Sequence, residues 1–403
     1  MSIPDPQAHL EVPAQDAALS ADALRALHPV QDMPDDSPTE ALGLCLSGGG
    51  YRAMLFHLGA LWRLNETKLL KDVERISSVS GGSITAATLG LHWSALDWRD
   101  GVARNLDELL VNPVRELAGE TIDASSVIEG LLPFTSVGKR VAHAYREHLF
   151  GEATLQELPD DEQREGPRFV ICATNLESGV LFRFSRPYLA DYRVGTIRQP
   201  EIALADAVAA SSAFPPVLSP FEIDLSEADW ETVDGNVLVA PEWRGEIKLS
   251  DGGVYDNLGL EAVWKRCQTV LISDGGGQTP DDSDPPSDWP RQSLRVLKII
   301  DNQVRALRKR QAVGSYRLGL RRGTYWGIRS HVADYELADA LEVSQDLTRE
   351  LAETPTRLKK LDSARQENLI NWGYVICDTA LRKWVKPRLE RPKRLPYPDA
   401  DLR

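Results

Sequence analysis

A serine lies at the junction between a short apolar run and a helix-prone run. Residues 73–79 are rich in β-branched side chains and end at Ser80, which is followed by Gly81 and Gly82. Residues 84–89 then favour a helix. A strand, a sharp turn with serine at its apex and a helix make up a nucleophile elbow, which exposes the hydroxyl above a helix N-terminus. The pattern therefore predicts that Ser80 is a nucleophile for acyl transfer.

The elbow pattern is imperfect, and two alternatives stay open. Such a turn needs small residues two positions before and after the serine. Here these are Ser78, where glycine is usual, and Gly82. One alternative places the nucleophile at Ser83, although the β-branched Thr85 then occupies a position that requires a small residue. The other is a strand–turn–helix connection without chemistry, because paired glycines mark turns of many kinds.

A glycine-rich turn follows the first apolar run, residues 41–46, and precedes a long amphipathic helix. Three glycines in such a turn expose successive backbone N–H groups beside a helix N-terminus, which suits an oxyanion or a phosphate. The lysine of a P-loop and the spacing of a dinucleotide-binding loop are missing. We therefore interpret the turn as an oxyanion hole formed by Gly48, Gly49 and Gly50 and supported by the charge of Arg52. A turn without chemistry is the alternative.

A third motif places a carboxylate at the end of a predicted strand over residues 246–249. Asp251 follows that strand and precedes two glycines, so its side chain is expected at a sheet edge. A carboxylate beside Ser80 can act as its general base without a histidine. A turn-forming Asp-Gly pair is one alternative. A Ser-Asp-His triad is another, because the order Ser80, Asp251, His331 is the order found in α/β-hydrolases.

The order of these three motifs resembles the patatin-like phospholipase family, and the resemblance covers about residues 41–275. The segment Ser47-Gly48-Gly49-Gly50-Tyr51-Arg52-Ala53-Met54 is also similar to the corresponding segment of the cytosolic phospholipase A2 enzymes. Further matches are the runs Ala173–Gly179, Ala210–Pro216 and Asp251–Asn257.

The resemblance implies a lipid acyl hydrolase that cleaves phospholipid esters through an acyl-enzyme. Ser80 would be the nucleophile and Asp251 the base of a Ser-Asp dyad, and neither a cofactor nor a metal is implied. The implied fold is a three-layer α/β/α sandwich with a largely parallel central sheet and additional helices. Some family members are switched on by ligands, so a small-molecule activator is a further hypothesis. A lipid- or nucleotide-binding module that has lost catalysis is the non-enzymatic alternative.

Strand and helix patterns alternate along the chain, which predicts a layered α/β domain. We expect a flexible arm over residues 1–38 and a catalytic domain over residues 39–330 that includes a mobile loop at 275–292. A helical extension packed on the same domain is expected over residues 331–403. The apolar stretch Gly130–Phe134 is interpreted as core packing, with a lid or a membrane-touching loop as alternatives.

Composition limits the location and the partners. The net charge of −14 over 403 residues argues against binding to nucleic acid polymers. No secretory signal or membrane-spanning run is recognisable, and the four separated cysteines are typical of buried thiols in a reducing compartment. We expect a cytoplasmic protein that is peripheral at membranes. The sequence makes no prediction of its oligomeric state.

One predicted helix stands out from this acidic background because it is strongly basic. It spans residues 294–320 and includes Arg305, Arg308, Lys309 and Arg310. A solvated helix face is the ordinary interpretation of such a charge run. The functional interpretation is a patch that binds an anionic ligand or a membrane surface.

Overall fold

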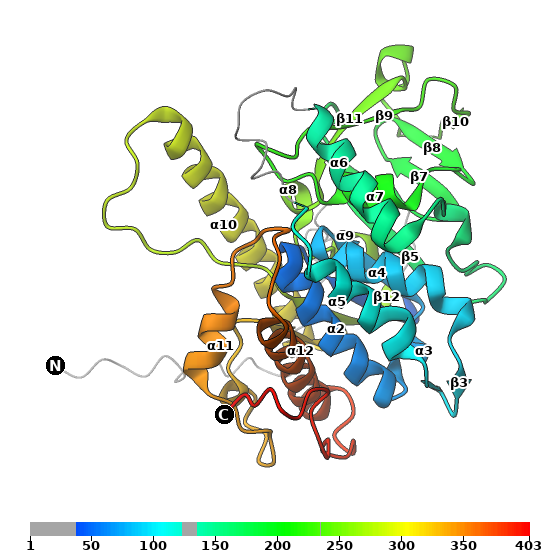
Figure 1. The fold of residues 1–403 in the computed structure, drawn as a ribbon. Coiled ribbons are helices and arrows are strands. Elements are labelled where there is room, and N and C mark those ends of the chain that lie inside the picture. Colours follow the sequence, from blue (N-terminus) through cyan, green and yellow to red (C-terminus); the bar gives the residue numbers. More distant parts are fainter. Residues whose placement is uncertain (1–37, 123–134, 234) are drawn as a thin grey trace, which may run out of the picture. The chain divides into compact units, whose positions relative to one another are not determined.

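The computed structural model describes residues 38–122, 135–233 and 235–403 (Figure 1). Two expectations therefore lie outside the described residues: all but the last residue of the N-terminal arm, and the apolar stretch Gly130–Phe134. The described residues belong to one compact unit. Among them, no helix combines the length and the apolar character that crossing a bilayer requires.

Five parallel strands form the centre of the sheet, in the order β5-β2-β1-β12-β13. Their bounds are Arg168–Asn175 (β5), Arg75–Val79 (β2), Thr39–Leu46 (β1), Cys267–Asp274 (β12) and Arg322–Gly327 (β13). Strands β1, β5 and β12 contain nearly continuous apolar runs because a parallel strand in the centre of a sheet is buried on both faces. Successive residues of β1 show this directly, since Leu44 and Cys45 are both buried but belong to different core clusters.

An antiparallel wing extends the sheet beyond β5. It contains β6 (Val180–Phe184), β7 (Tyr188–Asp191), β8 (Gly195–Arg198), β10 (Trp230–Glu231), β9 (Phe221–Asp224) and β11 (Glu246–Asp251). Strand β11 pairs antiparallel with the end of β5, so Asp251 lies opposite Ala173. The sheet is thus parallel in its centre, as expected, and mixed as a whole. A separate two-stranded ribbon joins β3 (Trp98–Arg99) and β4 (Val102–Ala103).

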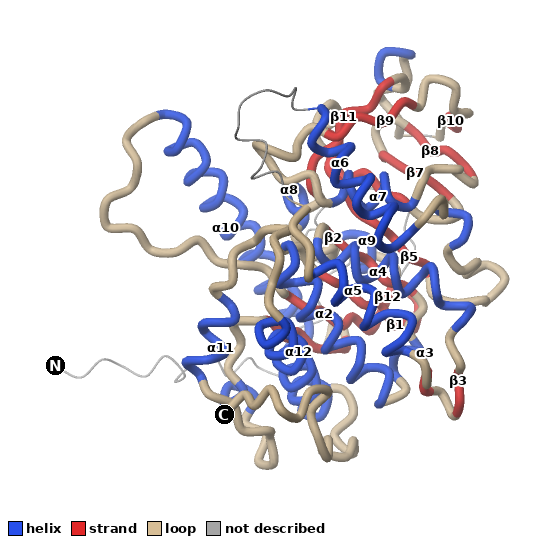
Figure 2. The backbone as a smooth tube through the Cα atoms, in the orientation of Figure 1, coloured by secondary structure: helices blue, strands red, loops and turns tan. Residues whose placement is uncertain are grey.

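Helices cover both faces, which gives the expected three layers (Figures 1 and 2). On one face the core includes side chains from α2 (Gly50–Glu66), α4 (Gly81–His92), α5 (Asn112–Ala118), α7 (Leu204–Ser211) and α12 (Ser363–Trp384). On the other face it includes α9 (Glu261–Trp264) and the C-terminal half of α10 (Trp289–Arg317). The remaining α-helices of the described residues are α3 (Leu69–Asp72), α6 (Thr135–Tyr145), α8 (Gly253–Asp256) and α11 (Gln345–Ala352).

Two expected boundaries differ from the observed ones. Helix α10 begins at Trp289 and not at Leu294, because Asp288 caps it by accepting a hydrogen bond from the Arg291 N–H. The loop expected at 275–292 therefore ends at residue 288.

The C-terminal helix α12 packs closely along α2. A Cβ at Gly59 would lie 1.8 Å from the Ile370 carbonyl oxygen, and one at Gly373 would lie 1.9 Å from that of Phe56. Only glycine permits this backbone approach. A buried ion pair between Arg63 and Asp378, 2.8 Å apart, joins the same two helices.

Candidate active site

Ser80 occupies the turn between β2 and α4, as the sequence predicts. Its backbone angles are φ 52° and ψ −121°. A positive φ is strained for any residue other than glycine, and such strain persists only where surrounding contacts hold it. One of these contacts is a hydrogen bond of 2.9 Å from the Ser80 backbone N–H to the Ser211 hydroxyl oxygen. The elbow is therefore held in place by a residue of α7, 131 positions away.

Buried hydroxyl groups form a network beneath the elbow. The Ser211 hydroxyl donates to the Cys172 carbonyl oxygen at 2.7 Å. The Ser83 hydroxyl lies 3.0 Å from that of Ser78 and 2.9 Å from that of Ser211. Ser83 is fully buried and does not line the cavity described below, so the geometry does not support the alternative nucleophile. Sequence reasoning missed the positioning role of Ser211, although the residue lies within the matched run Ala210–Pro216.

Close backbone packing explains the small residues of the elbow. A Cβ at Gly82 would lie 2.4 Å from the Leu46 carbonyl oxygen, and one at Gly81 would lie 2.1 Å from that of Gly50. Serine is tolerated at position 78 because the Ser83 hydroxyl is a hydrogen-bonding partner for its own. The departure from the usual elbow pattern therefore leaves the turn intact.

The glycine turn contacts the elbow, but its three glycines are not equivalent. Gly48 donates its backbone N–H to the Asn257 carbonyl oxygen at 3.0 Å, and this corrects the prediction that Gly48 is an oxyanion donor. Gly49 and Gly50 have positive φ values of 147° and 61°. Neither of their N–H groups is hydrogen-bonded to another described residue, and both residues line the cavity.

Arg52 is 2% exposed and connects segments that surround the glycine turn. It donates to the Gly275 carbonyl oxygen at 3.0 Å, to the Thr356 hydroxyl at 2.9 Å and to the Thr354 carbonyl oxygen. Burial, together with the positive charges of Arg305 and Arg329, lowers the pKa of Arg52 to about 10. These contacts fit the expectation that Arg52 supports the loop.

His57 is hydrogen-bonded to the residue that precedes the glycine turn. Its Nε2 lies 2.9 Å from the Ser47 carbonyl oxygen, and its Nδ1 lies 2.8 Å from the Ser273 hydroxyl. Burial lowers the pKa of this imidazole to about 4, so it is neutral at physiological pH. Because a carbonyl can only accept, Nε2 carries the proton.

Asp251 ends β11, where both its backbone groups and its side chain are hydrogen-bonded. Its N–H donates to the Ala213 carbonyl oxygen at 2.9 Å, and its carbonyl oxygen accepts from the Thr174 hydroxyl at 2.8 Å. Its carboxylate Oδ1 accepts from the Gly253 N–H at 2.7 Å. Thr174 and Ala213 belong to two of the runs singled out in the sequence, so these runs position the carboxylate.

Asp251 and Ser80 line the same cavity. Asp251 is 2% exposed, and burial raises its carboxyl pKa to about 7, even though the hydrogen bond from the Gly253 N–H and the nearby Ser80 hydroxyl favour the ionised form. Ser80, Asp251, Gly49 and Gly50 all line one cavity of about 1060 Å³. The strand ends and turns that carry them therefore bring a hydroxyl, a carboxylate and unpaired N–H groups to one space.

The cavity has two contrasting walls. One is the mostly apolar loop Phe214–Leu218. The other is charged and comes from α10, through Lys298, Asp301 and Arg305, and from Arg329 and the segment 353–357. His331, which the triad alternative requires, is exposed and is not among the lining residues.

A family model described as patatin-like phospholipase matches residues 44–264. The match covers more than half of the 403 residues and contains the elbow, the glycine turn and Asp251. The chain belongs to the patatin-like phospholipase family. This is a family of ester-hydrolysing lipases, so the fold class and the enzyme class expected from the sequence are confirmed at that level.

Solved structures of two proteins are similar to this patatin-like chain. One structure of human GIVD cytosolic phospholipase A2, in complex with methyl gamma-linolenyl fluorophosphonate, is 16% identical with a TM-score of 0.49, over 88% of this chain and 60% of that chain. Another structure of the human enzyme is 16% identical with a TM-score of 0.42, over 65% of this chain and 49% of that chain. VipD from Legionella pneumophila is 16% identical with a TM-score of 0.35, over 85% of this chain and 67% of that chain. The chain thus spans about half to two thirds of the length of these proteins. No curated protein sequence matches it significantly.

The basic helix lies outside the region matched by the patatin-like model, and its four expected patch residues do not form one surface. Arg305 lines the cavity. Arg308 is paired with Asp256 at 3.4 Å and with Glu261 at 3.1 Å. Lys309 lies over the Tyr325 ring, 4.4 Å from its centroid, and Arg310 is exposed.

The expected patch at residues 305–310 is therefore corrected. Its four basic residues have four different surroundings, because helical periodicity points them in different directions and because α8 and α9 supply the acids that pair with Arg308. In the part of the chain that the structure describes, no group of side chains is arranged to hold a metal ion.

Proposed function

We propose that this patatin-like protein hydrolyses carboxylic esters of phospholipids, with Ser80 as the nucleophile and Asp251 as its general base. The observation that carries the proposal is that Ser80 and the buried Asp251 line the same cavity as Gly49 and Gly50, where the Ser80 hydroxyl is near enough to the Asp251 carboxylate to favour its ionised form. Two groups in that relation can move a proton directly, without a histidine between them.

The acylation step follows from these positions. Asp251 accepts the Ser80 proton as the hydroxyl oxygen attacks the ester carbonyl carbon. The carbonyl oxygen becomes an oxyanion, which accepts hydrogen bonds from the N–H groups of Gly49 and Gly50 at the start of α2. The tetrahedral intermediate then collapses, and the leaving alcohol takes the proton from Asp251. An ester of the Ser80 hydroxyl remains.

Deacylation repeats the same proton transfers with water. Asp251 removes a proton from a water molecule that attacks the acyl-enzyme, and the glycine turn again holds the oxyanion. Collapse returns the proton to the Ser80 oxygen and releases the fatty acid. The pKa of about 7 suits both steps, because a general base works best when its pKa lies near the operating pH.

The two walls of the cavity support a phospholipid as the substrate class. The apolar wall Phe214–Leu218 offers a surface for an acyl chain. The charged wall carries Arg305 and Arg329, which can meet the phosphate of a headgroup. Arg52 makes three hydrogen bonds to its surroundings, which favours a supporting role for it over a direct contact with phosphate.

A phospholipid substrate implies contact with a membrane, so we propose a peripheral association from the cytoplasmic side. Regulation by a small-molecule activator stays a prediction from the family resemblance.

Covalent labelling tests the nucleophile. A fluorophosphonate ester should form an adduct at Ser80, detectable by mass spectrometry of the digested protein. Ser80→Ala should abolish the labelling and lower kcat by about 10³-fold or more on a soluble ester. An adduct at another residue would exclude Ser80, and the absence of any adduct would favour a binding module without catalysis.

A pair of variants separates the dyad from the triad. Asp251→Asn should abolish esterase activity because the amide cannot accept the proton. His331→Ala should keep most of it, because His331 does not line the cavity. The reverse result would establish the Ser-Asp-His triad. Product analysis on mixed phospholipid vesicles then identifies the ester bond that is cleaved.

A further inference from the structure

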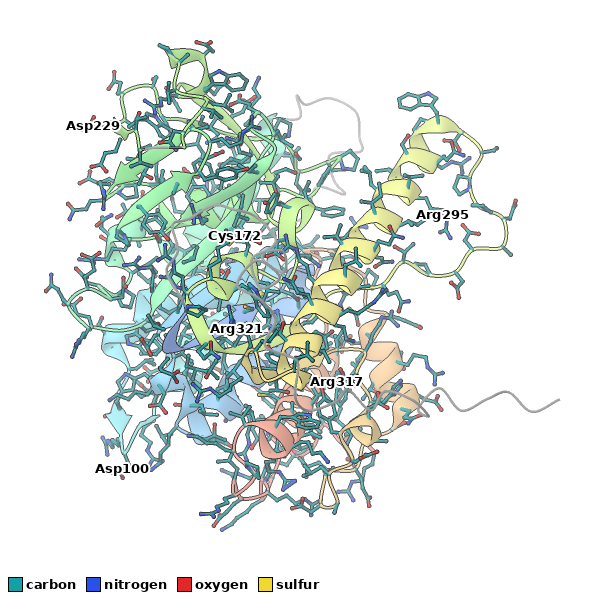
Figure 3. All side chains as sticks on the ribbon, turned by 180° about the vertical axis from the view of Figure 1, so that it is seen from behind. Asp100, Cys172, Asp229, Arg295, Arg317 and Arg321 are labelled. Atoms are coloured by element: carbon teal, nitrogen blue, oxygen red, sulfur yellow. The ribbon has the colours of Figure 1, made fainter. Side chains whose placement is uncertain are left out.

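The N-terminal half of α10 presents its apolar side to solvent. Five large apolar side chains along it are each about half exposed or more: Trp289, Val296, Leu297, Ile299 and Ile300. Leu307, just past the midpoint of the helix, is exposed as well. Figure 1 shows this half of the helix standing away from the sheet and the helices that cover it. In Figure 3, the labelled Arg295 lies on the free half, and the labelled Arg317 lies where the helix meets the body of the protein.

The polarity of this helix is inverted relative to an ordinary surface helix. With 3.6 residues per turn, Trp289, Val296, Ile300 and Leu307 fall on one stripe. The residues of α10 that line the cavity fall on the opposite side, and they are mostly polar: Leu294, Lys298, Asp301, Asn302 and Arg305. A surface helix normally buries its apolar face against the core. Here the buried residues of α10 are confined to its C-terminal half, at Ala312 and Ser315.

Basic residues outnumber acids on the polar side of the same segment, and two of them are paired with the preceding loop, Arg291 with Asp288 and Arg295 with Asp282. From Trp289 to Leu307 the sequence carries Arg291, Arg295, Lys298 and Arg305 against the single acid Asp301, in a chain whose net charge is −14. An amphipathic helix with tryptophan and aliphatic residues on one face and Lys or Arg on the other is the pattern of a helix that lies in a membrane interface. Basic residues at its flanks are attracted to anionic lipids.

The apolar stripe is also close to where a lipid must enter. The other side of α10 forms part of the cavity wall, and the opposing loop contributes Phe214 and Val217, which are exposed as well as cavity-lining. The stripe from Trp289 to Leu307 is about 27 Å long at 1.5 Å per residue. The stripe is only one to two side chains wide. Its area is therefore small compared with the roughly 800 Å² that each partner buries in a stable protein interface. A lipid surface therefore fits it better than a second copy of the chain.

We infer that the N-terminal half of α10 is the docking element that seats this protein on an anionic lipid surface beside the mouth of the cavity. The inference rests on the proposed function, because only a membrane-borne substrate requires such seating. It assigns membrane contact to the apolar stripe rather than to the basic residues 305–310. All of α10 lies beyond residue 264, the end of the match to the family model.

Sedimentation of the full chain with vesicles tests this assignment. The probe is a mixture of phosphatidylcholine and phosphatidylglycerol, compared with phosphatidylcholine alone. The triple variant Trp289→Ala/Val296→Ser/Ile300→Ser should lower the partition coefficient on the mixed vesicles by about tenfold or more, because it removes most of the apolar surface of the stripe. A matched control, Trp384→Ala/Val237→Ser/Val239→Ser, changes comparably exposed residues elsewhere and should bind like the wild type.

Two further measurements separate the possible failures. Hydrolysis of a soluble short-chain ester should be the same in both triple variants, since none of the six positions lines the cavity. Sedimentation velocity reports the oligomeric state. Unchanged vesicle binding by the α10 variant, or no binding by the wild type, overturns the inference. A dimer that only the α10 variant dissociates assigns the stripe to self-association and also overturns it. Loss of ester hydrolysis in the wild type would instead refute the proposed function, while vesicle binding still decides the role of α10.

Discussion

The two halves of the cavity are built by different physical means. The half that carries Ser80, Gly49 and Asp251 is buried, and backbone groups are held there by hydrogen bonds between strands, turns and α7. The half formed by α10 and the segment 353–357 is more exposed, and long charged side chains line it. The first lies within residues 44–264 and the second lies outside them.

This difference separates two tasks. Transition-state stabilisation needs donors and a base fixed to within fractions of an ångström, which a close-packed interior provides. Recognition of a headgroup or of a membrane surface tolerates mobile, solvated side chains. We therefore expect changes in the buried half to act mainly on kcat, and changes in the exposed half to act mainly on KM and on vesicle binding.

Apart from changes to Ser80 and Asp251 themselves, the largest expected effect in the buried half comes from Gly50→Ala. The new Cβ would lie 2.6 Å from the Arg357 carbonyl oxygen, at a residue whose φ is +61°. Because the obstacle is backbone, the glycine turn must shift, and kcat on a soluble ester should fall by about 100-fold or more. In Gly314→Ala of α10, the new Cβ meets nothing within 4 Å, so this control should keep full activity. Unchanged kcat in Gly50→Ala would refute the role of the turn as an oxyanion hole.

The next effect is the pH dependence set by Asp251. Because its carboxyl pKa is about 7, kcat/KM should rise with pH and level off above about pH 7. The folded state binds this proton more tightly than the unfolded state does, whose pKa is about 3.9. The Asp251 carboxyl group therefore makes its full contribution to the free energy of unfolding below about pH 4, and this contribution is lost as the pH rises to about 7.

Urea unfolding measures the stability side of this prediction. Asp251→Asn removes the buried charge, so at pH 8 it should raise the free energy of unfolding, by at most about 4 kcal/mol. Near pH 4 the variant and the wild type should differ little. A variant that is less stable than the wild type at pH 8 would mean that the carboxylate is better solvated or better paired than its burial indicates.

The smallest effect belongs to the exposed half. Arg305→Gln and Arg329→Gln remove charges that face the cavity, so KM for phospholipids in mixed micelles should rise by about three- to tenfold, with kcat nearly unchanged. Arg310→Gln on the same helix is the control, because Arg310 is exposed and does not line the cavity. If all three variants raised KM equally, the net charge of the protein, and not the position of the arginines in the cavity, would determine phospholipid binding.

Local patterns in the sequence were enough to predict the central strands, the turns and the position of Asp251. The apolar runs predicted the central parallel strands because a strand buried on both faces needs side chains of one kind. The glycines at positions 49, 50 and 82 and the serine at position 80 marked the turns, because only small or strain-tolerant residues fit such backbone. Asp251 was found in the same way, from a turn that ends a strand.

Only the tertiary structure decided which of these groups are available for chemistry. The N–H of Gly48 is taken by Asn257, Ser211 holds the backbone of Ser80, and Arg308 is neutralised by acids of another segment. Each partner lies tens to hundreds of positions away, so no local period or spacing reports it. The outward apolar face of α10 was hidden for the same reason, since a helical pattern shows that two faces differ but not which one meets the rest of the chain.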